Sequence, residues 1–213
     1  MIFDGHCDTL ITARRQGRLI SDHCTQGHVD FPRLSRAGVG CQVLALCSSR
    51  KEVQSALFQV MMGIRDLYSA LETTPHVFLI KESRDWEHLG KGLCLLLALE
   101  GADALEGSGE LLELLEKLGV RSLALTWNEA NDLAVGVMGG TGGVTPRGLR
   151  ILKKAAELQM VLDVSHLNSQ SFWDCQDYEG VLVASHSNCR VLCDHPRNLT
   201  DAQIKAVASR GGL

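Results

Sequence analysis

Short runs of apolar residues alternate along the chain with longer segments in which apolar residues recur every three to four positions. Runs that are apolar throughout are typical of strands buried on both faces of a parallel sheet. Six such runs are predicted to form strands, at 2–3, 39–46, 93–99, 122–125, 160–164 and 181–184. Strands that alternate with helices predict an α/β domain, and both a doubly wound sheet and a (β/α)8 barrel fit the pattern.

The segments between these runs contain helix signals. A predicted helix over 51–72 has an apolar stripe formed by Val53, Leu57, Val60, Met61, Ile64, Leu67 and Leu71. Four further helices are expected from residues that start or stop helices. These are Ser108 and Gly119 for 108–118, Pro146 for 146–158, Asn168 for 168–177, and the Thr200–Gln203 capping box with Gly211 for a last helix.

Composition and charge indicate a single globular domain and argue against nucleic-acid-binding, secreted and membrane proteins. The 213 residues are 45% hydrophobic, carry a net charge of −4 and are expected to form one domain over 1–213. With no basic run, nucleic acid is not an expected partner. We expect no signal peptide, because the chain does not start with a basic stretch followed by an apolar one. We expect no membrane segment, because the longest apolar run, 93–99, is too short, and a cytoplasmic location is predicted. The eight cysteines are then expected to be reduced.

One glycine-rich stretch, 136–145, could be mistaken for a phosphate-binding loop. It lacks the GxxxxGK[ST] spacing and does not directly follow a strand. We therefore expect a mobile surface loop there.

Metal-ligand residue types stand at the ends of four apolar runs. His6 and Asp8 follow 2–3, Glu100 follows 93–99, and the other two runs precede His166 and His186. Sites in α/β folds lie at the carboxyl ends of the strands, so these side chains are predicted to converge. Nitrogen and oxygen ligands without thiolate suit Zn²⁺, with Mn²⁺, Co²⁺ or Fe²⁺ as alternatives. Five ligands suit two metals about 3.5 Å apart that share a carboxylate.

The tetrapeptide GHxD occurs twice, at 5–8 and at 27–30. The first copy follows an apolar strand and is predicted to bind metal. In the second copy, Asp30 precedes Phe31 and Pro32, which predicts an N-cap with proline in the first turn of a short helix. His28 is then expected to be exposed or structural.

Several longer motifs resemble one family. They are DGHCDTL, LALEGADAL, LALTWNEAN, GGVTPRGLRILKKAAELQMVLDVSH and VLVASHSNCRVLCDHPRNLTDAQI, and together they run from residue 2 to the end of the chain. The chain resembles the membrane (renal) dipeptidase family and its bacterial relatives. The resemblance implies a (β/α)8 (TIM) barrel metallohydrolase with a binuclear zinc site. It also implies hydrolysis of dipeptides, including those with a D-residue at the C-terminal side.

The resemblance also implies residue roles. His6 and Asp8 bind one zinc, Glu100 bridges both zincs and positions the hydroxide nucleophile, and His166 and His186 bind the second. Arg197, in HPRNLTD, holds the terminal carboxylate of the substrate, a task that suits the guanidinium fork.

The chain departs from the family pattern in two places. Trp127 occupies the position of a histidine that contacts the reacting oxygen, and Asn128 or Asn131 is predicted to supply a donor instead. The family continues beyond residue 213, where an aspartate that transfers the proton is expected. The fold class predicted is thus an incomplete barrel of roughly six strands. Its open edges favour a homodimer or a separate C-terminal piece. We expect residues 1–213 alone to hydrolyse dipeptides more slowly than a full-length relative.

Two other function classes fit parts of the pattern. A lactonase, a deaminase or another amide hydrolase would use the same metals, but only a substrate with a free carboxylate needs Arg197. A truncated chain that folds or binds metal without turnover is the third possibility. Metal analysis and the Arg197→Ala variant separate the three.

Overall fold

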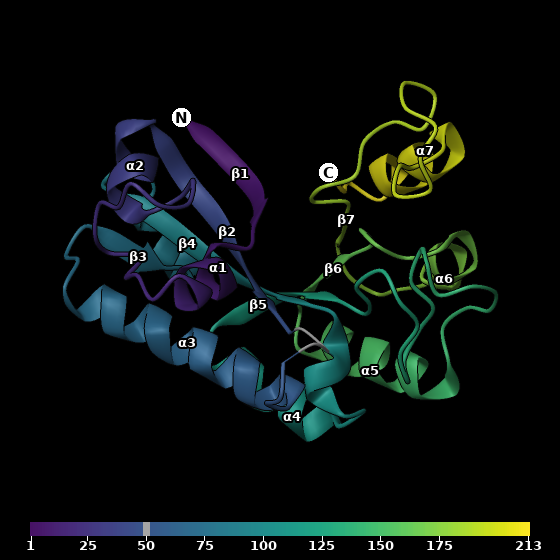
Figure 1. Ribbon diagram of the computed structural model, residues 1–213. Coiled ribbons are helices and arrows are strands. Elements are labelled where there is room, and N and C mark those ends of the chain that lie inside the picture. Colours follow the sequence, from purple (N-terminus) through teal and green to yellow (C-terminus); the bar gives the residue numbers. More distant parts are fainter. Residues whose placement is uncertain (49–51) are drawn as a thin grey trace. The chain divides into compact units, whose positions relative to one another are not determined.

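The computed structural model describes residues 1–48 and 52–213. Strands and helices alternate along the chain, and the chain forms two compact units (Figure 1). Unit 1 consists of residues 1–98 with 118–120, and unit 2 consists of residues 99–117 with 121–213. The strand pairs β1–β2, β3–β4, β5–β6 and β6–β7 are all parallel, as the apolar runs predicted. None of the helices in the described residues is long and apolar enough to cross a bilayer.

Unit 1 is built on two long apolar strands. Its elements are β1 (Ile2–Cys7), α1 (Thr9–Arg15), α2 (Phe31–Arg36), β2 (Val39–Cys47), α3 (Ala56–Glu72), β3 (Val77–Leu79), the 3₁₀ helix η1 (Ser83–His88) and most of β4 (Leu93–Glu100). β2 and β4 are buried along most of their length. Helices α1 and α3 contact each other and β2 (Figure 1). The three-residue strand β3 was not predicted, although the apolar run at 77–80 is as long as the predicted run at 181–184.

The expectation that every apolar run is buried on both faces is wrong for β1. Ile2 and Phe3 are 51% and 53% exposed. β1 is the end strand of the sheet and pairs with β2 alone among the described strands. A run of apolar residues therefore marked the strand correctly, but burial depends on how many neighbours the strand has.

The predicted helix over 51–72 is shorter than expected. α3 begins at Ala56, where the Ser55 hydroxyl accepts a hydrogen bond from the backbone N–H of Phe58. Val53 lies before the helix and is 99% exposed, so its place in the apolar stripe was wrong. Residue 51 lies outside the described residues. The central part of the stripe is confirmed, since Val60, Ile64 and Leu67 are buried.

Unit 2 begins with the last two residues of β4. It continues through the 3₁₀ helix η2 (Ala102–Leu105), α4 (Gly109–Lys117), β5 (Val120–Ala124) apart from its first residue, α5 (Pro146–Glu157), β6 (Val161–Asp163), α6 (Ser169–Asp174), β7 (Leu182–Val183) and α7 (Asp201–Ser209). α4 packs on α5, with an ion pair between Glu113 and Lys154. The backbone N–H groups of Gly101 and Ala102 donate to the carbonyls of Ala124 and Leu125, which brings the end of β4 beside the end of β5.

The predicted helix boundaries of unit 2 are largely confirmed. The side chains of Ser108, Asn168 and Thr200 each accept a hydrogen bond from a backbone N–H three residues on, and Thr200 and Gln203 form the capping box. Pro146 lies in the first turn of α5. α6 is shorter than the predicted 168–177. Capping is a local interaction between residues close in sequence, which explains why these boundaries can be read before the fold is known.

The cysteines are free thiols in this structure. Cys41 and Cys94 are buried with Ile80 in the core of unit 1. Burial raises the pKa of Cys41 to about 12, and the neighbouring Cys94 acts in the same direction. These thiols therefore behave as small apolar side chains.

Candidate metal centre

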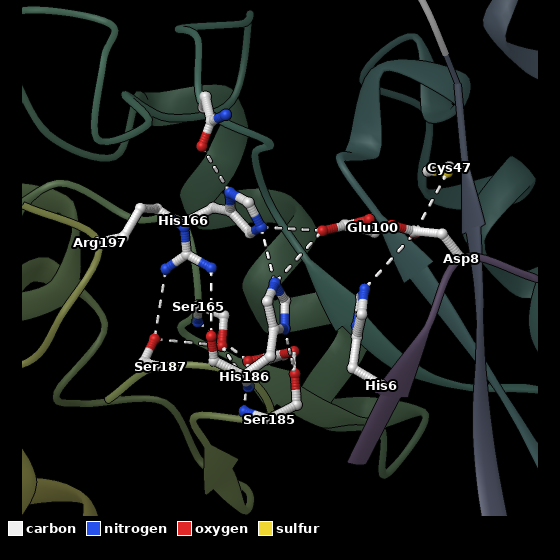
Figure 2. Close-up of polar contacts among 12 residues, drawn as sticks. His6, Asp8, Cys47, Glu100, Ser165, His166, Ser185, His186, Ser187 and Arg197 are labelled. Atoms are coloured by element: carbon white, nitrogen blue, oxygen red, sulfur yellow. Dashed lines mark hydrogen bonds and ion pairs between the residues drawn. The ribbon is translucent and has the colours of Figure 1, made fainter. Parts of the chain in front are cut away.

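Three of the predicted metal ligands come together in unit 2 (Figure 2). Glu100 is the last residue of β4, whereas His166 and His186 follow β6 and β7. Glu100 Oε1 lies 2.9 Å from Nε2 of His166 and 3.5 Å from Nε2 of His186. The two histidine nitrogens are 2.7 Å apart. The carboxyl ends of parallel strands meet at one edge of a sheet, which brings residues distant in sequence into this cluster.

The cluster is largely removed from water. The exposed fractions of the Glu100, His166 and His186 side chains are 5%, 7% and 26%. Burial lowers the pKa of His166, the hydrogen bond with Glu100 opposes this effect, and the positive charge of Arg197 adds to it. His166 is therefore favoured as a neutral imidazole, the form that can bind a metal.

The donor set of this cluster fits a divalent cation. Two imidazole nitrogens and one carboxylate oxygen converge, and each of them can act as an acceptor. Acceptors at these distances repel one another unless a proton or a cation lies between them. Burying a carboxylate at such a position is costly unless it is paired or bound to a metal. Nitrogen and oxygen donors of this kind suit Zn²⁺ and other first-row divalent metals.

His166 is held in an unusual backbone conformation. Its φ is +74°, in the left-handed region that non-glycine residues rarely adopt. The carbonyl of His166 accepts a hydrogen bond of 2.8 Å from the N–H of Val137, and Nδ1 of its ring lies 2.8 Å from Oδ1 of Asn128. Strained conformations of this kind persist where surrounding contacts hold them, and they are concentrated at functional sites.

The glycine-rich stretch 136–145 helps to build this environment, which the sequence analysis did not foresee. Its first residue, Gly136, is buried, and a Cβ there would lie 2.3 Å from the carbonyl oxygen of Trp127 and 2.6 Å from that of Asn128. Any side chain at this position would therefore displace the turn that carries Asn128. The expected surface loop is instead packed, at its start, against the residues that hold His166.

The other two predicted ligands lie together in unit 1. Nε2 of His6 is 3.5 Å from Oδ1 of Asp8, and the Cys47 thiol lies 3.6 Å from the same oxygen. Asp8 occupies the N-cap position of α1 without making a side-chain cap hydrogen bond. His6 lies within β1, which runs to Cys7 and is longer than the predicted 2–3. The side chains of His6 and Asp8 therefore face each other, as the alternation along a strand predicts.

The second GHxD copy is a helix start, as predicted. Asp30 is the N-cap of α2, and its carboxylate accepts a hydrogen bond of 2.7 Å from the N–H of Arg33. Pro32 lies in the first turn, and His28 is exposed. The two copies thus have different surroundings, because the first lies at the end of strand β1 and the second precedes helix α2.

Arg197 is half-buried in unit 2 beside the histidine cluster. Its guanidinium donates to the hydroxyl of Ser187 at 3.3 Å and to the carbonyl of His186 at 3.5 Å. Within the described part of the chain, no ion pair of Arg197 with a carboxylate is formed at 4.0 Å or less. It borders a small cavity of about 10 Å³, room for about one water, together with His166 and Ser187. A guanidinium whose hydrogen bonds go to a hydroxyl and a carbonyl is suited to bind an anionic group.

The remaining predicted site residues have varied surroundings. The Asn131 amide donates to Leu125 O and Asp103, and its oxygen accepts from the N–H groups of Leu133 and Ala134. Asn131 therefore stabilises the loop in which it lies. Trp127 is 52% exposed, with its ring centre 6.1 Å from that of His166. The substrate-binding roles of Asn128 and Asn131 stay predictions.

Sequence reasoning missed two residues behind His186. Asp163 is the last residue of β6 and is buried, and Ser185 directly precedes His186. Both lie within the motifs LDVSH and VASHS, next to the predicted ligands. Their position at strand ends was a usable signal, but an aspartate and a serine in such places are common in turns.

Comparison with known proteins identifies the family of the chain. A family model for membrane dipeptidases (peptidase family M19) matches residues 1–213. The chain is 40% identical over 131 residues to an uncharacterised protein in the pqqA 5′ region of Klebsiella pneumoniae, covering 58% of this chain and 48% of that protein. It is 25% identical over 238 residues to dipeptidase aclJ of Aspergillus oryzae, covering 99% of this chain and 55% of that protein.

The fold is that of solved metallopeptidases. A metallopeptidase of Rhodobacter sphaeroides, solved with a phosphinate mimic of the dipeptide L-Ala-D-Ala, matches with a TM-score of 0.91 and 24% identity. The match covers 100% of this chain and 72% of that one. The predicted fold class, an incomplete (β/α)8 barrel, is confirmed.

Because the family model matches the whole of residues 1–213, the chain belongs to the membrane dipeptidase family, peptidase family M19. The predicted family resemblance is thereby confirmed. The chain spans about half the length of the curated relatives it matches.

Proposed function

We propose that this chain carries the metal centre of a dipeptidase that uses two zinc ions to hydrolyse dipeptides. The observation that carries the proposal is the convergence of Glu100, His166 and His186 in unit 2, where two imidazole nitrogens face one buried carboxylate oxygen. Membership of the membrane dipeptidase family supports the reaction class. His6 and Asp8 complete the proposed ligand set.

The ligands divide by the metal they are proposed to hold. His6 and Asp8 would bind one ion, His166 and His186 the other, and Glu100 would bridge both. Zinc held by these residues would polarise a carbonyl and activate water near neutral pH. The buried Glu100 carboxylate would supply negative charge to the metals, and Asn128 holds the ring of His166 through Nδ1. These residues set the geometry of the site before a substrate binds.

The proposed substrate is a dipeptide with a free terminal carboxylate, including those with a D-residue on that side. The related Rhodobacter sphaeroides metallopeptidase was solved with a mimic of L-Ala-D-Ala, which supports this choice. In this chain, Arg197 is proposed to bind the carboxylate with its planar fork. Its neutral partners, Ser187 and the carbonyl of His186, orient the guanidinium without neutralising it.

Metal removal tests the proposed function. A chelator is expected to abolish hydrolysis of a panel of dipeptides that includes Xaa-D-Ala, and added zinc is expected to restore it. The measurements are metal content and dipeptide hydrolysis by the protein that contains this chain. Hydrolysis that survives complete metal removal would contradict the proposal, and so would a chain that binds no divalent metal.

Arg197→Ala tests the substrate class. This change is expected to raise KM for free dipeptides about 10- to 100-fold, because a hydrogen-bonded charge pair contributes about 1.5–3 kcal/mol. KM for a neutral ester or lactone should stay the same. Arg197→Lys, which keeps the charge but loses the fork, should recover only part of the loss. If KM rises equally for charged and neutral substrates, Arg197 does not bind the carboxylate.

A further inference from the structure

A chain of hydrogen bonds leads from the buried Asp163 to the metal-facing ring of His186. The hydroxyl of Ser185 lies 2.8 Å from Nδ1 of His186, and it also forms a short hydrogen bond with Oδ2 of Asp163. Figure 2 shows Ser185 beside the His186 ring, on the side away from Glu100. Asp163, Ser185 and His186 all belong to unit 2. None of the proposed metal ligands other than His186 takes part.

The position of Asp163 is fixed by the backbone. Its Oδ1 accepts hydrogen bonds from the N–H of Ser165 at 2.9 Å and from the N–H of Ser185 at 3.2 Å. Its Oδ2 faces the Ser185 hydroxyl. The partners in these three contacts all donate, so Asp163 accepts with both oxygens. The carboxylate thereby joins the end of β6 to the residues after β7.

The direction of each hydrogen bond follows from counting protons. A serine hydroxyl has one proton, and an ionised carboxylate can only accept. Ser185 must therefore donate its proton to Asp163, and its oxygen must accept from Nδ1–H of His186. A neutral imidazole carries only one N–H, so Nε2 of His186 holds the lone pair. This is the nitrogen that lies 3.5 Å from Glu100 and 2.7 Å from Nε2 of His166.

We infer that Asp163 and Ser185 are positioning residues that hold His186 as the Nδ1–H tautomer with Nε2 directed at the metal. The inference rests on the proposed metal centre. Partners of this kind commonly fix the tautomer and ring orientation of a metal-binding histidine, and their loss typically costs 10- to 100-fold in metal affinity. Neither residue is proposed to touch the metal or the substrate.

Asp163→Asn should reverse the chain of hydrogen bonds. The asparagine oxygen can still accept hydrogen bonds from the N–H groups of Ser165 and Ser185, which places its NH2 group against the Ser185 hydroxyl. Ser185 must then accept from asparagine and donate to Nδ1 of His186, which selects the opposite tautomer, with the proton on Nε2. Ser185→Ala removes the relay without reversing it, and Ser185→Thr keeps the hydroxyl.

The tautomer is measured on the metal-free 213-residue chain by long-range ¹H–¹⁵N NMR of the histidine rings. We expect His186 to be Nδ1–H in the wild-type chain and Nε2–H in Asp163→Asn. Zinc affinity, measured by competition with a chromogenic chelator, should fall about 10-fold in Ser185→Ala and about 100-fold in Asp163→Asn. Ser185→Thr should bind zinc like the wild type. Ser209→Ala is the matched control, since this exposed hydroxyl of unit 2 donates to the carbonyl of Ala206 within α7, and it should leave zinc affinity unchanged.

The inference is overturned if His186 keeps the same tautomer in the wild type and Asp163→Asn, or if Ser185→Ala binds zinc as tightly as the wild type. Thermal unfolding of each variant identifies any loss of fold, and Ser185→Ala still decides the question if Asp163→Asn does not fold. A wild-type chain that binds no zinc would refute the proposed function. In that case, the metal-free tautomer measurement would still decide whether Asp163 and Ser185 control the His186 ring.

Discussion

Glu100→Gln is expected to reduce the affinity of the chain for zinc by about a thousandfold or more. An anionic ligand contributes several kcal/mol to the binding of a divalent metal. About 4 kcal/mol corresponds to a factor of a thousand in affinity. Glutamine has nearly the same shape as glutamate but cannot bring negative charge to the two imidazoles that face this position. The loss should therefore be electrostatic, with the shape of the site retained.

Zinc titration and thermal unfolding measure this effect together. Zinc should raise the melting temperature of the wild-type chain, because a ligand that binds only the folded state stabilises it. The Glu100→Gln variant should lose this rise, while its metal-free unfolding free energy stays within about 1 kcal/mol of the wild type, since glutamine keeps an acceptor oxygen beside His166 and removes the cost of burying a charge. Glu179→Gln, at an exposed position, is the control and should keep the zinc response. An unchanged zinc response in Glu100→Gln would remove Glu100 from the ligand set.

Asp30→Ala is expected to lower the free energy of unfolding by about 3 kcal/mol. The Asp30 side chain is fully buried and accepts three hydrogen bonds, two of 2.7 Å from the N–H and Nε of Arg33 and one of 3.1 Å from the N–H of Cys24. Its removal leaves the start of α2 uncapped and the Arg33 guanidinium without its carboxylate. Asp30→Asn should cost less, because the amide oxygen can still cap the helix.

Urea unfolding provides the measurement, with Asp22→Ala as the control. Asp22 is exposed, so its replacement should change the free energy of unfolding by less than about 0.5 kcal/mol. Equal losses in the two variants would show that the buried position of Asp30 has no special importance.

The stabilisation by Asp30 should depend on pH. Burial alone would raise the pKa of Asp30, but the hydrogen bonds from Arg33 and Cys24 together outweigh it and hold the pKa below its ordinary value of 3.8. The folded state therefore favours the charged form. Its contribution is fully present above that ordinary value and is lost as the pH falls through the lower folded pKa. The difference between wild type and Asp30→Ala should shrink between about pH 5 and about pH 2.

The two GHxD copies show how much of the site could be predicted from local patterns. The apolar residues that start β1 before His6 and the proline after Asp30 distinguish the copies, and both interpretations depend on neighbours within a few residues. The same holds for the Thr200–Gln203 capping box. Hydrogen bonds of this kind form between residues close in sequence, so they can be predicted before the fold is known.

The support of the histidine cluster could not be predicted in the same way. The left-handed conformation of His166 depends on Val137, and the tautomer of His186 depends on Asp163, which precedes it by many residues. Gly136 was interpreted as part of a surface loop because no local pattern shows that a carbonyl will lie where its Cβ would be. Each of these contacts joins segments that approach only after the strands have paired.

By itself, the sequence determined the α/β class, most helix boundaries and the five candidate ligands, because apolar periodicity, capping and ligand chemistry are all encoded by residue type and short spacing. Only the tertiary structure decided that Ile2 and Phe3 are exposed, that Asn128 contacts His166 and that Ser185 and Asp163 stand behind His186. The physical reason is the range of the interactions. Burial and hydrogen-bond direction depend on which strands become neighbours, and residue spacing along the chain does not contain that information.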